Sequence, residues 1–222
     1  MKKERNLIFL SVALCCAAMA VVDIFIKLPY FARSGVKIFI FLLVPILFAR
    51  YKKLSLLDIL KPDRRSVLLG AVLGVGTFAV IIGGYALLAP FLDLSGIPAA
   101  LEKNVGVTRE NFPIVAIYIA LCNSLLEEFF FRGFSYLALK KVSDEKTAMI
   151  FSAAAFSVYH AAIMDGWMSF GLTAALLLAL FGCGIFFNFL DRRSERIWAS
   201  WLPHLCANLA INSIGMMLLM AA

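Results

Sequence analysis

Histidine is scarce in this chain, and cysteine follows no metal-binding pattern. The 222 residues include two histidines and five cysteines, and no two cysteines are spaced as CxxC. Structural zinc sites draw four Cys and His ligands from short, regular spacings, so the sequence predicts no metal site and indicates no cofactor. The cysteines are odd in number and all lie in apolar runs, which is typical of small packing residues and not of a disulfide framework.

Alternating polar and apolar residues, internal repeats, low-complexity tracts and linkers are absent as well. Strands of a membrane β-barrel alternate polar and apolar residues, so the sequence excludes a barrel. Without repeats or linkers, residues 1–222 are expected to form a single integral-membrane domain. The net charge of +7 is assigned to basic loops beside a membrane, and no nucleic-acid partner is expected.

Long apolar runs are what the chain has instead. Hydrophobic residues make up 63% of it, and its mean hydropathy is +0.92. Several runs reach the roughly 20 residues with which a helix crosses a bilayer. The predicted fold class is therefore all-α, a polytopic transmembrane helical bundle of about seven spans, at residues 7–26, 36–49, 67–90, 113–139, 147–163, 168–190 and 197–220.

Four local features refine the predicted helical bundle or leave more than one interpretation of it open. Residues 91–111 are interpreted as a loop with one or two helical turns, although a further membrane segment there would change the span count. Residues 54–60 are interpreted as a short helix on the membrane surface. Gly70-x-x-x-Gly74 permits close contact with another helix. Ala18-Met19-Ala20 resembles a signal-peptidase site, so residues 1–20 are either a cleaved signal or the start of an uncleaved first span.

Basic residues are unevenly divided between the two ends of the predicted spans. With the N-terminus inside, 16 Lys and Arg fall on the inner side and 5 on the outer side, namely Lys27, Arg33, Lys37, Lys103 and Arg109. Because basic residues favour cytoplasmic loops, we expect a cytoplasmic N-terminus and an outer C-terminus. The compact chain favours a bacterial plasma membrane, and membrane lipid is an expected partner.

Charged residues inside the fourth predicted span are the main functional signal. Glu127, Glu128 and Arg132 lie in one of the most apolar parts of the chain. Ionisable residues in membrane helices are costly and mark functional sites. Glu128 and Arg132 are spaced i,i+4 with the acid first, which predicts a structural ion pair. Glu127 has no such partner in its own helix, so we expect its partner from another helix, with His160 the obvious candidate.

Other polar residues of the later spans can reach the depth of Glu127. Glu127 and His160 are equally far in sequence from the turn that joins the fourth and fifth spans, so they should lie at nearly equal depth. Phe156, four residues earlier, is expected to hold the His160 ring. His204 and Asn208 are also i,i+4 and share a helix face. Each alone has a structural interpretation, but four polar groups at one depth indicate a site.

Two aspartates, Asp23 and Asp191, lie near predicted span ends and are expected to be solvated.

The expected cluster suits amide hydrolysis. A carboxylate beside a histidine can take a proton from water and generate a hydroxide-like nucleophile. A second histidine and an amide are donors suited to a developing oxyanion. No serine or cysteine is implicated as a nucleophile, so the pattern predicts hydrolysis without a covalent enzyme intermediate.

Three motifs carry a family resemblance. In order along separate spans, they are Glu127-Glu128-x-x-x-Arg132, Phe156-x-x-x-His160 and His204-x-x-x-Asn208. They resemble the motifs of the CAAX prenyl protease and bacteriocin-processing family of intramembrane glutamate proteases, also called the Abi family. The resemblance covers residues 127–208 and places the catalytic motifs within 113–220.

The resemblance implies a role for each motif residue. Glu127 would activate water with help from His160, and His204 with Asn208 would line the oxyanion site. The remaining motif residues would support the site (Glu128, Arg132 and Phe156). The resemblance also implies a helical bundle whose site opens to the cytoplasmic side. Eukaryotic members cut prenylated proteins, and bacterial members serve peptide maturation, bacteriocin self-immunity and regulated proteolysis.

The predicted function is therefore an intramembrane endopeptidase that hydrolyses a peptide bond in a membrane-associated or lipidated protein or peptide. A metal-dependent membrane hydrolase is one rival, since two carboxylates and two histidines suffice for zinc, although there is no HExxH. A non-enzymatic immunity or regulatory partner protein is a second rival. A transporter with a proton-relay glutamate is a third, and the absence of an internal repeat counts against it.

Overall fold

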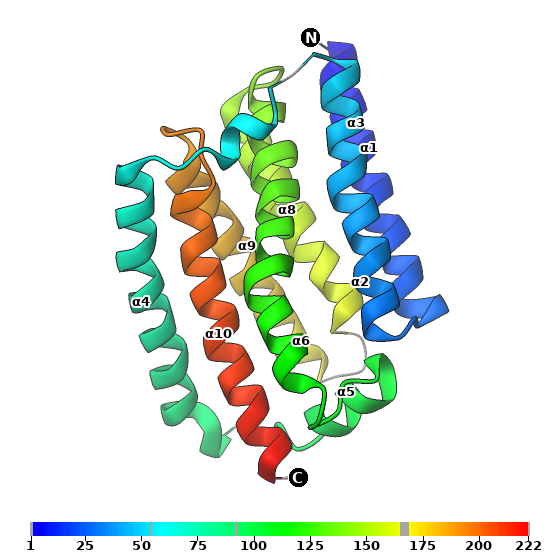
Figure 1. Cartoon of the computed structure of the whole chain (residues 1–222), viewed down its shortest axis with the longest axis vertical. Coiled ribbons are helices and arrows are strands. Elements are labelled where there is room, and N and C mark those ends of the chain that lie inside the picture. The colour runs from blue at the N-terminus through cyan, green and yellow to red at the C-terminus, as the bar shows by residue number, and fades with distance from the viewer. Residues whose placement is uncertain (1, 54, 92, 165–168, 222) are drawn as a thin grey trace.

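The computed structural model describes residues 2–53, 55–91, 93–164 and 169–221, and every regular element in them is a helix (Figure 1). This confirms the predicted all-α bundle. The elements are α1 (Lys2–Val21), η1 (Val22–Ile26), α2 (Tyr30–Ile38), η2 (Phe39–Leu43), α3 (Val44–Tyr51), η3 (Leu57–Leu60), α4 (Arg64–Leu88), η4 (Ala89–Phe91), α5 (Ile97–Val105), α6 (Phe112–Tyr118), η5 (Ile119–Asn123), α7 (Ser124–Glu127), η6 (Glu128–Ala138), α8 (Glu145–Ile163), α9 (Phe170–Asp191) and α10 (Trp198–Ala221).

Six helical segments of the described chain are long and apolar enough to cross a membrane, so the protein is an integral membrane protein. They are Lys2–Ile26, Tyr30–Tyr51, Arg64–Phe91, Phe112–Ala138, Phe170–Asp191 and Trp198–Ala221. Each corresponds to a predicted span. The second is longer than predicted, because α2 begins directly after Pro29. Met168, the predicted start of the sixth span, lies outside the described residues.

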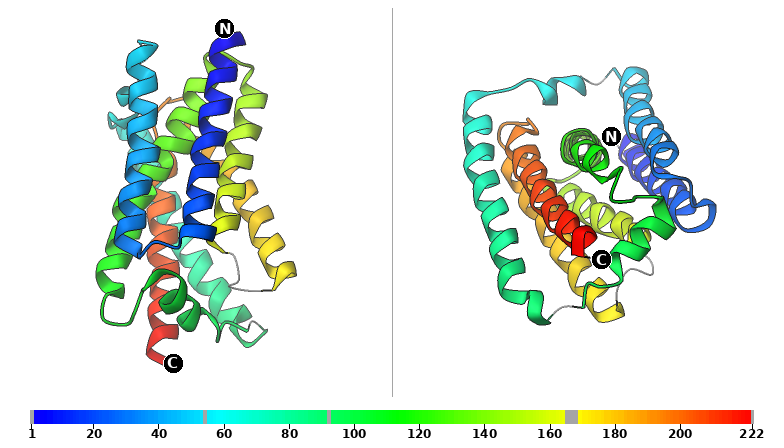
Figure 2. Two further views of the ribbon diagram at one scale, coloured as in Figure 1. Left: turned by 90° about the vertical axis from the view of Figure 1, so that its right-hand side faces the viewer. Right: turned by 60° about the horizontal axis from the view of Figure 1, so that its bottom comes forward.

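Helix α8 takes the place of the remaining predicted span. It has 19 residues, which is about 28 Å of α-helix, but its sequence is less apolar than the other six. Its buried face includes Ser152, Ser157 and Tyr159, and it packs against α1, α9 and η6 (Figure 2). Its polar side chains therefore meet protein and not lipid.

Side-chain caps fix where two helices begin. Asp63 accepts a hydrogen bond from the Ser66 amide at 2.9 Å at the start of α4, and Asp144 accepts one from the Thr147 amide at 2.8 Å at the start of α8. Such caps satisfy amides that the first helical turn leaves unpaired. The cap at Asp144 follows the turn that leads α8 back alongside η6.

The segment Phe112–Ala138 forms the centre of the bundle. Half of its most apolar window is buried inside the protein, a larger share than in the other five candidate spans. Its hydrogen bonding widens to the π-helical pattern at η5 and again along η6. Stretches of π-helix are rare and often occur at functional sites. Glu127 ends the short α-helical turn between them.

Close packing joins α4 to α10. A Cβ atom added at Gly70 would lie 2.5 Å from the Trp198 carbonyl oxygen, and one at Gly74 would lie 2.8 Å from the Cys206 Sγ. Both glycines are therefore needed for the contact that Gly70-x-x-x-Gly74 permits. This contact places α4 beside the helix that carries His204.

The short helix expected at residues 54–60 forms in part. A 3-10 turn, η3, covers Leu57–Leu60, and Leu54 lies outside the described residues. Ile59 is buried, where it packs over Gly133, and its carbonyl accepts a hydrogen bond from the Ile197 amide at 3.2 Å. The segment therefore covers one end of the central helix.

No helix within residues 93–111 is long enough to form a further membrane span. Their one helix, α5, has nine residues, about 14 Å, which is too short to cross a bilayer. It lies at the end of the bundle opposite the N-terminus, near the C-terminus (Figure 1).

Candidate active site

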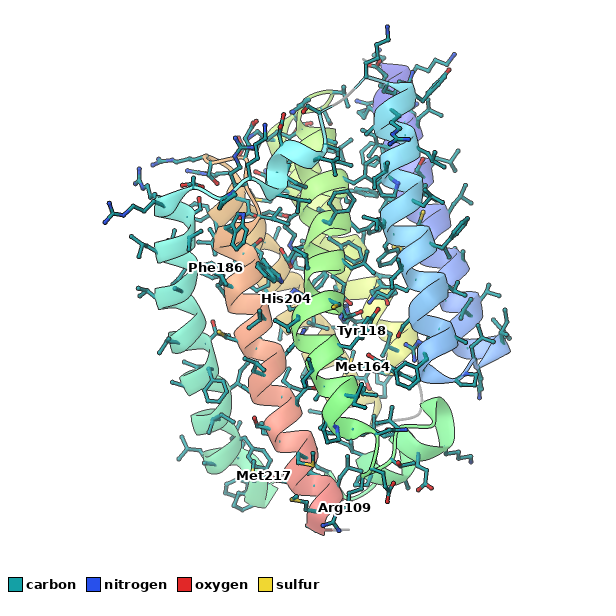
Figure 3. The ribbon with its side chains drawn as sticks, in the orientation of Figure 1. Arg109, Tyr118, Met164, Phe186, His204 and Met217 are labelled. Carbon is teal, nitrogen blue, oxygen red and sulfur yellow. The ribbon has the colours of Figure 1, made fainter. Side chains whose placement is uncertain are left out.

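The two adjacent glutamates lie at the centre of the protein with 2% and 0% exposure, Glu127 and Glu128 respectively. Their carboxylates have different partners. Glu127 faces α2, α8 and α10, whereas Glu128 pairs within its own helix and with α10. Figure 3 shows His204 in the first half of α10, on the side toward the helix of the glutamates. The structure thus gives the two glutamates separate environments.

One oxygen of Glu127 is firmly held. Its Oε1 accepts hydrogen bonds from Lys37 Nζ at 2.5 Å and from Asn123 Nδ2 at 3.1 Å. Lys37 Nζ also donates to Asn123 Oδ1 at 2.6 Å and lies 4.9 Å from the centre of the Tyr159 ring. A buried charge is tolerated when it is paired and hydrogen-bonded, as Glu127 and Lys37 are here.

The other oxygen of Glu127 lies between two imidazole rings. Its Oε2 is 3.8 Å from His160 Nε2 and 3.6 Å from His204 Nε2. Both distances are too long for a direct hydrogen bond and suit a group shared among the three atoms. The structure therefore brings Glu127, His160 and His204 together, as the sequence analysis expected.

Hydrogen bonds at the far side of each ring fix how the histidines point. His160 Nδ1 lies 2.7 Å from the Phe156 carbonyl oxygen, which can only accept, so Nδ1 carries the proton. His204 Nδ1 lies 2.8 Å from Glu128 Oε1 and donates to it in the same way. In each ring, Nε2 is the nitrogen that faces Glu127. The Phe156 ring also packs edge-on against His160 at 4.6 Å.

Asn208 takes part in two environments. Its Nδ2 donates to the Ile119 carbonyl at 3.2 Å, which is the helix–helix hydrogen bond that the sequence left open as an alternative. It also lines the same cavity as Glu127, His160 and His204. An amide nitrogen carries two protons, so one donor remains for a ligand.

Arg132 and its surroundings form a buried polar cluster behind the site. Arg132 has 0% exposure, and its Nε lies 3.2 Å from Glu128 Oε2. The guanidinium carbon lies 4.2 Å from the Phe156 ring centre and 5.0 Å from that of Phe187. Glu128 thus links Arg132 to His204, and the predicted i,i+4 pair is present in the structure.

The expectation that Asp23 and Asp191 are solvated is wrong. Asp191 is fully buried and accepts a hydrogen bond from Ser200 Oγ at 2.6 Å. Asp23 pairs with Arg33 at 2.6 Å, and its side chain is 1% exposed. Both lie at helix ends, as predicted, but neighbouring helices cover those ends.

Lys37 is the site residue that sequence reasoning missed. The charge count placed it outside, yet it lies within α2 with 6% exposure and contacts Glu127 directly. Two signals were available in the sequence: Lys37 falls within the predicted span 36–49, and Asn123 precedes Glu127 by four residues, so their side chains share a helix face. Without Lys37, four of the five basic residues assigned to the outer side of the membrane remain there.

The cavity at the site has a volume of about 210 Å³ and extends from Glu127 toward the α5 end of the bundle. Tyr30 and Ser34 at the start of α2, Leu101 in α5 and Phe112 at the start of α6 line its outer part. The charge count places this end outside the cell. The predicted orientation and the cytoplasmic opening implied by the resemblance therefore exclude each other.

No three His, Cys, Asp or Glu side chains of the described residues are arranged to hold a metal ion. The distances from Glu127 to the histidines are instead those of groups that share a small polar molecule.

Comparison with known proteins identifies the segment that carries the site. The family model described as type II CAAX prenyl endopeptidase Rce1-like matches residues 109–210, which include all seven motif residues. No curated protein and no solved structure matches the chain. The match agrees with the resemblance of the three motifs. Residues 109–210 are therefore similar to the type II CAAX prenyl endopeptidase Rce1-like family, which is a family of proteases.

Proposed function

We propose that the protein is an intramembrane glutamate endopeptidase in which Glu127 activates a water molecule. The observation that carries this proposal is the division of labour between the two oxygens of Glu127. Lys37 and Asn123 hold Oε1, while Oε2 is left facing His160 and His204. A base needs one free lone pair aimed at the proton it abstracts, and Oε2 has this freedom.

His160 serves as the second acceptor for the attacking water. Because Nδ1 donates to the Phe156 carbonyl, Nε2 of the neutral ring presents a lone pair on the Glu127 side. Water held between Glu127 Oε2 and His160 Nε2 loses one proton to the carboxylate as its oxygen adds to the carbonyl carbon. The C–N bond then breaks, and the same proton passes from Glu127 to the leaving amine.

His204 and Asn208 stabilise the oxyanion that forms on the carbonyl oxygen. His204 Nδ1 donates to Glu128 Oε1 at 2.8 Å, which turns Nε2 into the site, where a donor role requires a proton on Nε2 as well. The free N–H of Asn208 is the second donor. Fixed donors of this kind cost no rearrangement when negative charge develops.

The substrate is a membrane-associated or lipidated protein or peptide. The cavity that reaches Glu127 has an apolar lining from Leu101, Val107, Phe112, Val115 and Ile163, which supports an apolar peptide segment beside the scissile bond. The family description adds support for a prenylated C-terminus as one such substrate.

The proposal is tested without a known substrate. Wild type and Glu127→Ala are expressed at matched levels, and protein and peptide termini across the cell are compared by mass spectrometry. We expect a set of new termini that depends on Glu127. Indistinguishable termini from two folded proteins would favour the immunity or regulatory interpretation.

A chelator separates the glutamate mechanism from the metal-dependent one. Cleavage of a substrate identified through its Glu127-dependent terminus should continue in EDTA or 1,10-phenanthroline. Loss of cleavage that returns on addition of zinc would overturn the proposed glutamate mechanism. The protein would still be an endopeptidase, but a metal-dependent one.

A further inference from the structure

A second cavity, which we name the arginine pocket, lies at the end of the bundle that carries the N-terminus. It has a volume of about 550 Å³ and lies between the start of α4, the end of α9 and the turn from α9 to α10. Figure 1 shows these segments together at that end, opposite α5. Its charged lining consists of four arginines and one aspartate, namely Arg65, Arg192, Arg193, Arg196 and Asp63.

The positive charge of the arginine pocket is only partly offset by neighbouring acids. No carboxylate of the described residues lies within 4.0 Å of any of the four guanidinium groups. Arg196 donates to the Asp58 carbonyl, and Arg192 lies over the Phe189 ring at 4.4 Å. Arg65 and Arg193 are exposed.

The one acid of the pocket has a structural task. Asp63 caps α4, and hydrogen bonds from the Ser66 side chain and amide lower the pKa of Asp63, so it is ionised at neutral pH. The lining therefore holds one negative charge against four positive charges.

Apolar side chains form the wall below the arginines. Leu69 on α4 and Phe189 on α9 are 43% and 50% exposed, and Leu190 lies beside them in the lining. All three belong to segments long and apolar enough to span the membrane. The pocket thus joins a cationic rim at a helix end to an apolar wall that runs into the membrane.

The arginine rim together with the apolar wall is more than the orientation of the protein in the membrane requires. Arginines that only fix orientation act from any cytoplasmic loop and need neither a cavity nor an apolar wall. A soluble phosphate ion would use the rim alone. Basic pockets between membrane helices are suited to anionic lipid headgroups, whose phosphate meets the arginines while the acyl chains follow the wall.

We propose that the arginine pocket binds the phosphate headgroup of an anionic glycerophospholipid, with the acyl chains along Leu69 and Phe189. The site is separate from the Glu127 cavity and does not depend on the proposed peptidase activity. It lies directly before α10, the helix that carries His204.

The test compares two double variants that lose the same charge. Arg65→Gln with Arg193→Gln removes two exposed arginines of the pocket. Arg50→Gln with Arg64→Gln removes two exposed arginines at the same end that do not line it. Both proteins and wild type are purified in an uncharged detergent, and binding of dioleoyl-phosphatidylglycerol and dioleoyl-phosphatidylcholine is measured by native mass spectrometry.

We expect wild type and the control variant to bind phosphatidylglycerol more tightly than phosphatidylcholine, and the pocket variant to bind phosphatidylglycerol roughly tenfold more weakly. Equal binding by all three proteins, or an equal loss in both variants, would overturn the proposal. Millimolar inorganic phosphate should leave the lipid bound; complete displacement by it would assign the pocket to a soluble anion instead. Thermal unfolding confirms that each variant is folded.

Discussion

At the scale of single residues, the site is an arrangement of charges that offset one another. Glu127 is paired with Lys37, and Glu128 is paired with Arg132 and His204. The two oxygens of each carboxylate have different partners. Of the two residues, Glu127 is the one that lines the cavity together with both histidines, and its Oε2 lies nearest to them. The partner of Glu127 comes from α2, which lies outside the family-matched segment 109–210.

Lys37→Met should slow cleavage by ~10²-fold with little change in folded yield, because Glu127 Oε1 loses the contact that fixes the carboxylate. The acid limb of the pH–rate profile should move to higher pH, since the lost cation had favoured the ionised carboxylate. Rates are measured on a substrate identified by its Glu127-dependent terminus.

Two further variants complete that experiment. Lys37→Arg should restore part of the rate and the original pH profile, and Lys103→Met on exposed α5 should leave both unchanged. An unaltered pH profile in Lys37→Met would show that Lys37 serves folding alone.

Glu128→Gln should lower the stability of the protein more than Glu127→Gln does. Arg132 cannot lose its proton and would remain as a buried cation without a counter-ion, at a cost of about 3–5 kcal/mol. Lys37 can become neutral and keeps Asn123 as a partner when Glu127 is changed. Thermal unfolding in detergent measures the difference, with Glu102→Gln on exposed α5 as the control.

Equal melting temperatures for Glu127→Gln and Glu128→Gln would contradict the different tasks given to the two glutamates.

Sequence spacing predicted which residues of the later helices meet, because helical rise and the i,i+4 rule depend on short distances along one or two helices. His160 and His204 could be placed in this way. Lys37 could not, since its contact with Glu127 joins residues 90 positions apart and depends on how the first hairpin docks. The burial of Asp191 was missed because it depends on how neighbouring helices pack around the end of α9.

At the scale of the helices, two glycines set the distance between α4 and α10. The spacing of Gly70 and Gly74 predicted that a helix contact is permitted there, but the partner helix is known only from the fold. The π-helical course of Glu128–Ala138 could not be foreseen either, because the sequence pattern there is also compatible with an α-helix. Helix existence was predictable from apolar length, whereas helix neighbours and local winding were not.

Gly70→Ala should destabilise the protein by about 1–3 kcal/mol, because the new Cβ would meet the Trp198 carbonyl and push α4 away from α10. Gly76→Ala is the matched control on the same helix, since nothing lies within 4 Å of its added Cβ. The Gly76→Ala variant should be as stable as wild type or slightly more stable, because alanine favours a helix more than glycine does. Thermal unfolding that ranks the two variants in the opposite order would contradict the α4–α10 contact.

At the scale of the whole molecule, the direction of the cavity is the feature that bears on substrate access. The cavity runs from Glu127 toward α5, whereas aromatic side chains of η6 fill the protein toward the other end. Charge counting alone predicts the orientation of the bundle, and only the fold shows at which end the cavity lies. If the N-terminus lies inside, as the charge count predicts, the proposed substrates would reach the site from the outer side.

Ser34→Cys should react with a membrane-impermeant maleimide added to intact cells, because Ser34 lines the cavity at the α5 end. Lys141→Cys, exposed at the opposite end, should react only after the cells are opened. The parent protein, with its five native cysteines, gives the background. The reverse pattern would place the N-terminus outside and the cavity toward the cytoplasm.

The pairing of Lys37 with Glu127 also has a consequence for biosynthesis. Ribosomes complete the first hairpin, including Lys37, some 90 residues before they complete Glu127. Until Glu127 is made, Lys37 lacks this carboxylate partner, and an unpaired lysine inside a bilayer is energetically costly. The arrival of the central helix relieves this cost, so the charge needed to hold the carboxylate also helps to recruit it during membrane insertion.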